Sequence, residues 1–154
     1  MSIATNPIHI LFADDDSDDY EFFKESIITA GIKVQLDNVD DGEKLMQYIL
    51  KVEQPPPPDI IFMDINMPFK NGKECLAEIR EDKRFDQVPI IMFSTSENPK
   101  DIEDTFSKGA NLYISKMIFF GAEQEVLQYL FAENWKDKLV NVPKERFVIK
   151  KPFK

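Results

Sequence analysis

Four short apolar runs recur along the chain, and none of them alternates between apolar and polar residues. They are Ile10–Ala13, Ile60–Met63, Ile90–Phe93 and Leu112–Ile114. Strands that are apolar on both faces are typical of a parallel sheet covered by helices on both sides. A fifth segment, Val34–Val39, mixes apolar with polar residues and is expected to form a strand at the edge of the sheet.

Helical signals lie between these runs. An apolar stripe on one helical face ends at Gly31, which can serve as a C-terminal cap. Asn98 and Pro99 suit the cap and the first turn of a later helix, and a last helix is expected from about Gly121 to Leu130. Five alternations of strand and helix predict an α/β fold with a parallel sheet and helices on both faces.

The amino-acid composition of the chain excludes several classes of function. The chain of 154 residues suits one domain, and no apolar run approaches the length that crosses a bilayer. A single cysteine, Cys75, indicates a reducing cytoplasmic location. A single histidine, His9, excludes a multi-histidine metal site, and a net charge of −9 argues against a nucleic-acid partner. A membrane partner is not expected either.

The C-terminal residues differ in charge from the rest of the chain. From Glu133 onward there are seven Lys or Arg residues against three acidic ones. We therefore expect one domain over residues 1–132 and a basic tail over residues 133–154, with no separate output domain. The tail could pack on the acidic body, pair with a second copy or be disordered. Packing on the body is preferred, because the tail holds many apolar residues that are costly to leave in water.

Polar residues follow four of the predicted strands. These residues are Asp14–Asp16, Asp64, Ser94–Ser96 and Ser115–Lys116. The carboxyl ends of parallel strands lie at one edge of a sheet, so these side chains are expected to converge there.

This combination predicts a site that accepts a phosphoryl group. Clustered carboxylates repel one another unless a cation is present, and Mg²⁺ prefers oxygen ligands. A carboxylate such as Asp64 can attack phosphorus and form an acyl phosphate. Lys116 could neutralise the transferred group, and Ser94 could donate a hydrogen bond to it.

At these residues the sequence resembles the receiver domains of two-component response regulators, of which the single-domain chemotaxis regulator is the best-known type. The resemblance rests on Asp14-Asp15, on Asp64 within MDINMP, on Ser94 after PIIMF and on Lys116. It covers roughly residues 8–131. It implies a flavodoxin-like, doubly wound fold of five strand–helix units, with a parallel sheet in the order 2-1-3-4-5.

The resemblance also implies the chemistry of each carboxylate. Asp64 would accept the phosphoryl group from a phosphohistidine of a sensor histidine kinase or a histidine phosphotransfer protein. Asp15 would bind Mg²⁺ directly, and Asp14 would act largely through water. Asp64 and the backbone carbonyl of Asn66 would complete the metal ligands.

Other positions would respond to the phosphoryl group. Ser94 and Lys116 would bind its oxygens, and Tyr113 would be the aromatic switch residue that moves between outward and inward positions. Asn66 and Thr95 occupy positions where receivers tune the lifetime of the phosphorylated state. The output would be contact with a downstream protein target, and the sequence leaves a homodimer open.

One position departs from the family pattern. Receivers usually have proline after the lysine, whereas this chain has Met117. The apolar residues Met117, Ile118 and Phe119 could either fold onto the core or form an exposed patch where a partner docks.

Parts of this pattern also occur in proteins with three other functions. A haloacid-dehalogenase-type phosphatase usually has a second aspartate two residues after its nucleophile, where this chain has Asn66. A flavodoxin-like cofactor carrier is disfavoured because Asp14–Asp16 would repel a phosphate. A receiver-like binding module that does not use phosphate remains open because of Met117. On the preferred interpretation the protein is no enzyme, apart from catalysing its own phosphorylation and dephosphorylation.

Overall fold

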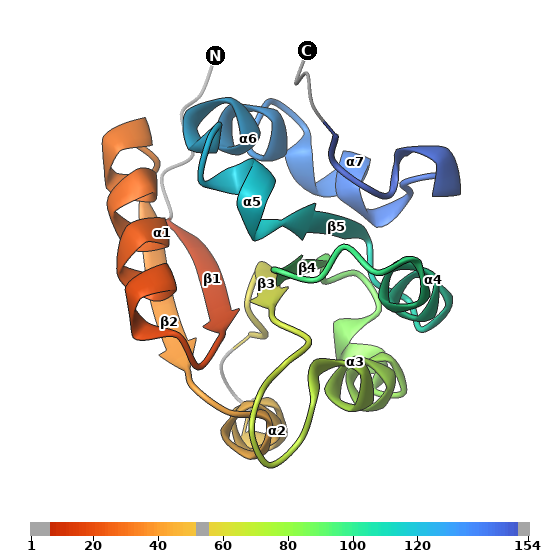
Figure 1. The fold of residues 1–154 in the computed structure, drawn as a ribbon. Helices are drawn as coiled ribbons and strands as arrows, with labels where there is room; N and C mark the ends of the chain where they lie inside the picture. Colours follow the sequence, from red (N-terminus) through yellow and green to blue (C-terminus); the bar gives the residue numbers. More distant parts are fainter. Residues whose placement is uncertain (1–6, 52–55, 151–154) are drawn as a thin grey trace.

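A single parallel sheet forms the centre of the molecule (Figure 1). The structure is a computed structural model that describes residues 7–51 and 56–150. The strand order is β2-β1-β3-β4-β5, which confirms the order that the family resemblance implies. The strands are β1 (Ile8–Ala13), β2 (Val34–Val39), β3 (Ile60–Met63), β4 (Ile90–Ser94) and β5 (Leu112–Ser115).

Helices cover both faces of the sheet (Figure 1). The helices are α1 (Ser17–Ala30), α2 (Gly42–Lys51), α3 (Gly72–Arg80), α4 (Pro99–Ser107), α5 (Lys116–Phe119), α6 (Glu123–Leu130) and α7 (Trp135–Val140), with short 3-10 helices η1 (Lys83–Phe85) and η2 (Lys144–Arg146). Side chains of α2, α3 and α4 pack in one core, and those of α1, α5, α6 and α7 pack in the other. The fold is therefore doubly wound, as predicted.

Along a central strand, successive side chains point alternately into the two hydrophobic cores. In β1, Leu11 and Ala13 point into the core under α2 and α3, whereas Ile10 and Phe12 point into the core under α1 and α6. All four of these residues are at most 1% exposed. This explains why the run is apolar throughout, since a strand buried on both faces has no position for a solvated side chain.

The helix ends follow local chemistry that the sequence contains. The carboxylate of Asp16 accepts hydrogen bonds from the backbone N–H groups of Asp18 and Asp19 and so caps α1. Gly31 ends this helix with φ of 74°, in the left-handed region that glycine favours. Asn98 caps α4 in the same way, as predicted.

The segment after β5 differs from the prediction. The sequence indicated one helix from about Gly121, but the chain first forms the four-residue helix α5 and only then α6. The prediction missed α5 because its apolar residues, including Phe119, carry no helical period over so short a stretch.

The described part of the tail packs on the body, which confirms the preferred interpretation for residues 133–150. Leu139, Phe147 and Ile149 are 3%, 1% and 8% exposed, respectively. The N–H of Tyr113 donates to the carbonyl of Phe147 at 2.8 Å, and the N–H of Ile149 donates to the carbonyl of Tyr113 at 3.0 Å. The tail thus continues the sheet beyond β5 by one bridge, between Tyr113 and Val148.

The boundary at residues 132 and 133 stays a prediction. Residues 1–6, 52–55 and 151–154 of the two predicted ranges lie outside the described residues. Within residues 7–51 and 56–150, no helix combines the length and the apolar character that a membrane span needs.

Candidate functional site

Three aspartates meet at the carboxyl ends of β1 and β3. Ala13 and Met63 are partners in the register of these strands, so the residues that follow them lie side by side. The N–H of Asp64 donates to the carbonyl of Ala13 at 2.9 Å, which fixes this alignment. As a result, carboxylate oxygens of Asp14, Asp15 and Asp64 all lie within 4.8 Å of one another.

Lys116 enters this cluster from the end of β5. Its side chain is 3% exposed, and its Nζ lies 2.8 Å from Asp14 Oδ2 and 3.0 Å from Asp64 Oδ2. A third carboxylate, Asp19 Oδ2, lies 2.7 Å from the same nitrogen. The sequence predicted that Lys116 converges with Asp14 and Asp64 at this edge, but it did not predict the contact with Asp19. The only sequence signal for Asp19 is its place in the first turn of the helix that starts at the edge of the site.

Burial and nearby charges shift the pKa values of Asp14 and Lys116. Burial raises the pKa of Asp14 from its ordinary value of 3.8 to about 6, although contacts with Lys116 oppose that rise. Burial acts to lower the pKa of the Lys116 ammonium, but its short contacts with the carboxylates of Asp14, Asp19 and Asp64 outweigh that effect. The pKa of Lys116 therefore lies above its ordinary value, and the lysine stays charged.

Asp14→Asn is expected to stabilise the metal-free fold. Because the folded state holds the Asp14 proton more tightly than the unfolded state, the free energy of unfolding falls as the pH rises from 3.8 to above 6. At about pH 8 the neutral asparagine avoids this cost, so urea unfolding should show a gain of about 1–2 kcal/mol over wild type.

Addition of Mg²⁺ provides the matched comparison for this variant. Mg²⁺ should raise the free energy of unfolding of wild type, because a ligand that binds only the folded state stabilises that state. The increase should be much smaller for Asp14→Asn, because this variant lacks one of the carboxylates expected to bind the metal. A variant that is less stable than wild type without metal would contradict the unfavourable burial of Asp14.

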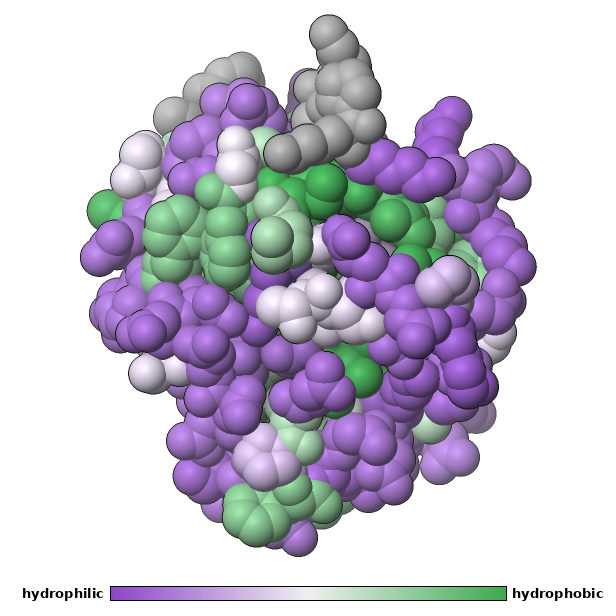
Figure 2. Space-filling model, in the orientation of Figure 1, coloured by the Kyte–Doolittle hydropathy of each residue, from purple (hydrophilic) through white to green (hydrophobic). Residues whose placement is uncertain are grey.

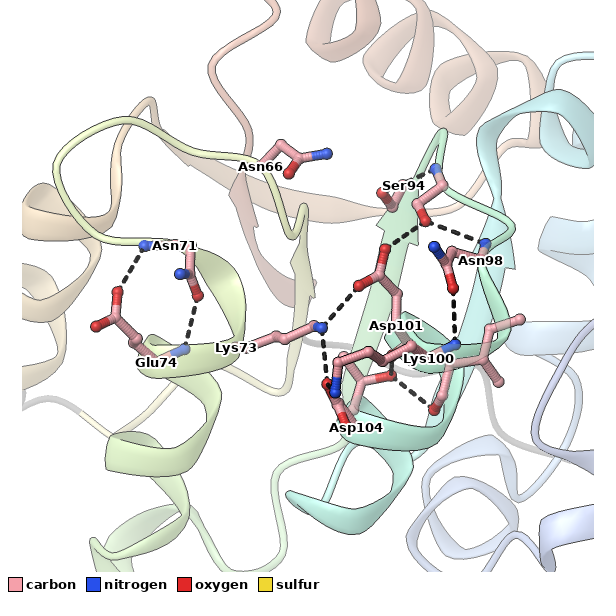
Figure 3. A network of polar contacts seen from close by, with 12 residues as sticks. Asn66, Asn71, Lys73, Glu74, Ser94, Asn98, Lys100, Asp101 and Asp104 are labelled. Carbon is pink, nitrogen blue, oxygen red and sulfur yellow. Dashed lines mark hydrogen bonds and ion pairs between the residues drawn. The ribbon is translucent and has the colours of Figure 1, made fainter.

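Ser94 and the two predicted tuning residues lie around the carboxylates. Ser94 ends β4 and is completely buried, and its Oγ accepts a hydrogen bond from the N–H of Ser96 at 3.2 Å. Asn66 and Thr95 are both exposed in the loops that follow β3 and β4. The N–H of Asn66 donates to Asp64 Oδ1 at 3.3 Å. Figure 3 shows Asn66 and Ser94 at the ends of these neighbouring strands.

Tyr113 occupies an inward position. It is 1% exposed, and its hydroxyl donates to the carbonyl of Ser96 at 2.8 Å. The hydroxyl of Ser96 donates in turn to Asp101 Oδ2 at 2.5 Å. Asp101 and Asp104 both contact Lys73, at 2.7 and 2.9 Å, which links α4 to α3 (Figure 3). The loop after β4 is thus fixed by Tyr113 on one side and by α4 on the other.

The residues after Lys116 divide between core and surface. Phe119 is fully buried among the phenylalanines of the α1 core, so its place in an exposed partner patch was wrong. Met117 is 67% exposed, Ile118 is half-buried and Phe120 is 36% exposed. Figure 2 shows hydrophobic residues gathered over this region on a largely hydrophilic face. Partner contact by Met117 and Ile118 stays a prediction.

Met117 also supplies a group that proline lacks. Its N–H donates to Ser115 Oγ at 3.1 Å, which caps the start of α5. A proline here would remove that donor. The departure from the family pattern therefore accompanies a capped helix that begins at Lys116 itself.

Comparisons with known proteins agree with this geometry. The family model of the response regulator receiver domain matches residues 10–129. Response regulator Rcp1 of Synechocystis sp. is 31% identical over 120 residues, which cover 75% of this chain and 82% of that protein.

Solved structures show the same fold. The Mn²⁺-bound form of Rcp1 superposes with a TM-score of 0.75 at 26% identity and covers 89% of this chain and 99% of its own. The phosphorylated cyanobacterial phytochrome response regulator RcpA gives a TM-score of 0.74 at 26% identity and covers 82% and 96%, respectively. The family match does not support the phosphatase or the flavodoxin-like carrier. This chain belongs to the response regulator receiver domain family and takes part in phosphorylation-based two-component signalling.

Proposed function

We propose that Asp64 accepts a phosphoryl group from a phosphohistidine of a sensor histidine kinase or a histidine phosphotransfer protein. The observation that carries this proposal is the position of Asp64, which lies between two further aspartates and the buried Lys116. An Asp64 oxygen would form the new bond to phosphorus while the phosphorus–nitrogen bond breaks. The imidazole leaves with its electron pair and takes up a proton, and an acyl phosphate results.

The residues at this edge fit a divalent cation. Three carboxylates offer hard oxygen ligands, and the buried Asp14 Oδ2 accepts no hydrogen bond from the described residues, although Lys116 lies close to it. Asp14, Asp15, Asp64 and the backbone carbonyl of Asn66 would hold Mg²⁺. The metal would neutralise charge on the transferred group. Rcp1 has been solved with Mn²⁺ bound, which supports a divalent metal at such a site.

Ser94, Lys116 and Tyr113 would then change partners. Lys116 and the Ser94 hydroxyl are the groups expected to contact the new phosphoryl oxygens. Movement of Ser94 would disturb Ser96, whose N–H donates to Ser94 and whose carbonyl holds the Tyr113 hydroxyl. The surface formed by α4, β5 and α6 would thereby respond to phosphorylation as a shift between two states.

The output of this switch would be contact with a downstream protein. The net charge of −9 supports a protein partner over nucleic acid or an anionic membrane. A cytoplasmic location fits the single cysteine, Cys75, which is free and buried. Met117 and Ile118 would contribute to the partner surface, and a homodimer is an alternative form of that contact. The module catalyses only its own phosphorylation and dephosphorylation.

Phosphoryl uptake from acetyl phosphate tests the proposal. Wild-type protein is incubated with this donor in Mg²⁺ or in EDTA, and intact mass spectrometry measures the fraction that carries one phosphoryl group. The expected result is uptake with Mg²⁺ and none with EDTA, because the transferred group needs charge neutralisation. No uptake under either condition would instead support the binding module that does not use phosphate.

A further inference from the structure

Asp19 is a fourth acidic residue at the site, and it is not one of the three aspartates, Asp14, Asp15 and Asp64, whose carboxylates could hold a metal ion together. It lies in the first turn of α1, and its Oδ2 is the carboxylate oxygen nearest to Lys116 Nζ, at 2.7 Å. The side chain is 17% exposed, so the contact is largely sheltered from water. Asp19 therefore contacts the lysine without belonging to the metal cluster.

The fold fixes this contact from both ends. On the side of Asp19, the Asp16 carboxylate caps α1 and accepts a hydrogen bond from the Asp19 N–H at 3.1 Å. Lys116 directly follows the buried strand β5. Its ammonium lies over the Phe93 ring, with Nζ 5.6 Å from the ring centroid. The neighbouring Asp18 is exposed, and its side chain contacts no cation among the described residues.

Lys116 has few N–H donors, so Asp19 competes for them with any other acceptor at the site. An ammonium group has three N–H donors. Three carboxylates, from Asp14, Asp19 and Asp64, already lie within 3.0 Å of Nζ. A cation bound by the carboxylates of Asp14, Asp15 and Asp64 would attract Asp14 and Asp64 away from the lysine. Asp19 would stay bonded to Lys116, because its oxygen is not one of the atoms that could bind the cation.

We propose that Asp19 is a positioning residue that competes with the phosphoryl group for Lys116 and so weakens binding of that group at Asp64. The inference rests on the proposed function of Asp64 and Lys116. It concerns a residue in α1 that acts through the lysine and does not touch the transferred group. Asp19 thereby sets how readily the site gives up its metal-only state for the phosphorylated state.

Beryllofluoride, which mimics a phosphoryl group on a carboxylate, provides the binding test. Its affinity is measured by titration calorimetry at saturating Mg²⁺ for wild type, Asp19→Asn and Asp18→Asn. Asp19→Asn should bind about five- to tenfold more tightly than wild type, the range expected when a charged hydrogen bond to the lysine is weakened. Asp18→Asn is the matched control, since it removes the same charge from the same helical turn, and it should change the affinity by less than about twofold.

A double-mutant cycle shows whether the effect passes through the lysine. In a Lys116→Ala background, Asp19→Asn should no longer alter beryllofluoride affinity, because no ammonium is left to compete for. An equal gain with and without Lys116, or an equal gain from Asp18→Asn, would overturn the proposal in favour of a general charge effect.

The metal-free protein supplies a spectroscopic test that does not depend on phosphoryl chemistry. In wild type the Lys116 ammonium should give a slowly exchanging ¹H–¹⁵N signal, and Asp19→Asn should speed its exchange while Asp18→Asn should not. If wild type binds no beryllofluoride, the proposed function itself fails. If wild type binds it and Asp19→Asn neither tightens binding nor alters the ammonium signal, the inference about Asp19 alone is overturned.

Discussion

Replacing Asp64 with asparagine is expected to reduce Mg²⁺-dependent phosphoryl uptake to the background level. An amide oxygen is too weak a nucleophile to attack phosphorus at a useful rate. The substitution also removes one negative charge from the three carboxylates that could bind the metal ion. The fold should survive, because asparagine has nearly the same shape and the site holds a further buried carboxylate, Asp14, beside it. The free energy of unfolding should therefore change by no more than about 1 kcal/mol.

Intact mass after incubation with acetyl phosphate and Mg²⁺ measures this effect, and urea unfolding checks the fold. Asp86→Asn is the matched control, since Asp86 is an exposed aspartate at the end of η1 and outside the metal-ligating cluster. The control should take up label as wild type does. Equal labelling of the Asp64 variant and wild type would show that another residue is the acceptor.

Phe147→Ala is expected to cause the largest loss of stability. The Phe147 ring is 1% exposed and lies 5.1 Å from the Phe106 ring and 6.2 Å from the Tyr113 ring, measured between centroids. Truncating a fully buried phenylalanine removes these contacts and leaves a cavity. The free energy of unfolding should fall by about 3–5 kcal/mol.

The single tryptophan, Trp135, reports this transition by fluorescence during urea unfolding, and circular dichroism follows the rest of the chain. Arg146→Ala is the control, because Arg146 is exposed next to Phe147 and should change stability by less than about 0.5 kcal/mol. A loss below about 1 kcal/mol for Phe147→Ala would mean that the tail is not part of the same cooperative unit as the body.

The central strands and the convergence of Asp14, Asp64 and Lys116 could be predicted because both depend on local information. A buried parallel strand shows itself as an unbroken apolar run, and the residue after each run must lie at the shared edge. The register of β1 with β3 then brings Asp14 and Asp64 together without further information. The strand order came from the family resemblance, since neighbouring pairs are not specified by the runs themselves.

Contacts made across the fold could not be predicted in this way. Asp19 has the sequence context of an ordinary acidic first turn, and only the packing of α1 against α5 and α6 brings it to Lys116. Arg80 is similar: it donates to the carbonyls of Gly109, Phe85 and Val88 and to the Asn111 side chain. These partners lie up to 31 positions away in the sequence, and no local pattern links them.

The bridge between the tail and β5 has a consequence for association between molecules. A strand at the border of a sheet presents backbone N–H and C=O groups that can pair with a strand from another chain. Here the outward-facing N–H of Tyr113 donates a hydrogen bond to the C=O of Phe147, and the C=O of Tyr113 accepts one from the N–H of Ile149. The tail thus blocks strand addition at this border, so a tail-less chain would offer β5 as a template for edge-to-edge aggregation.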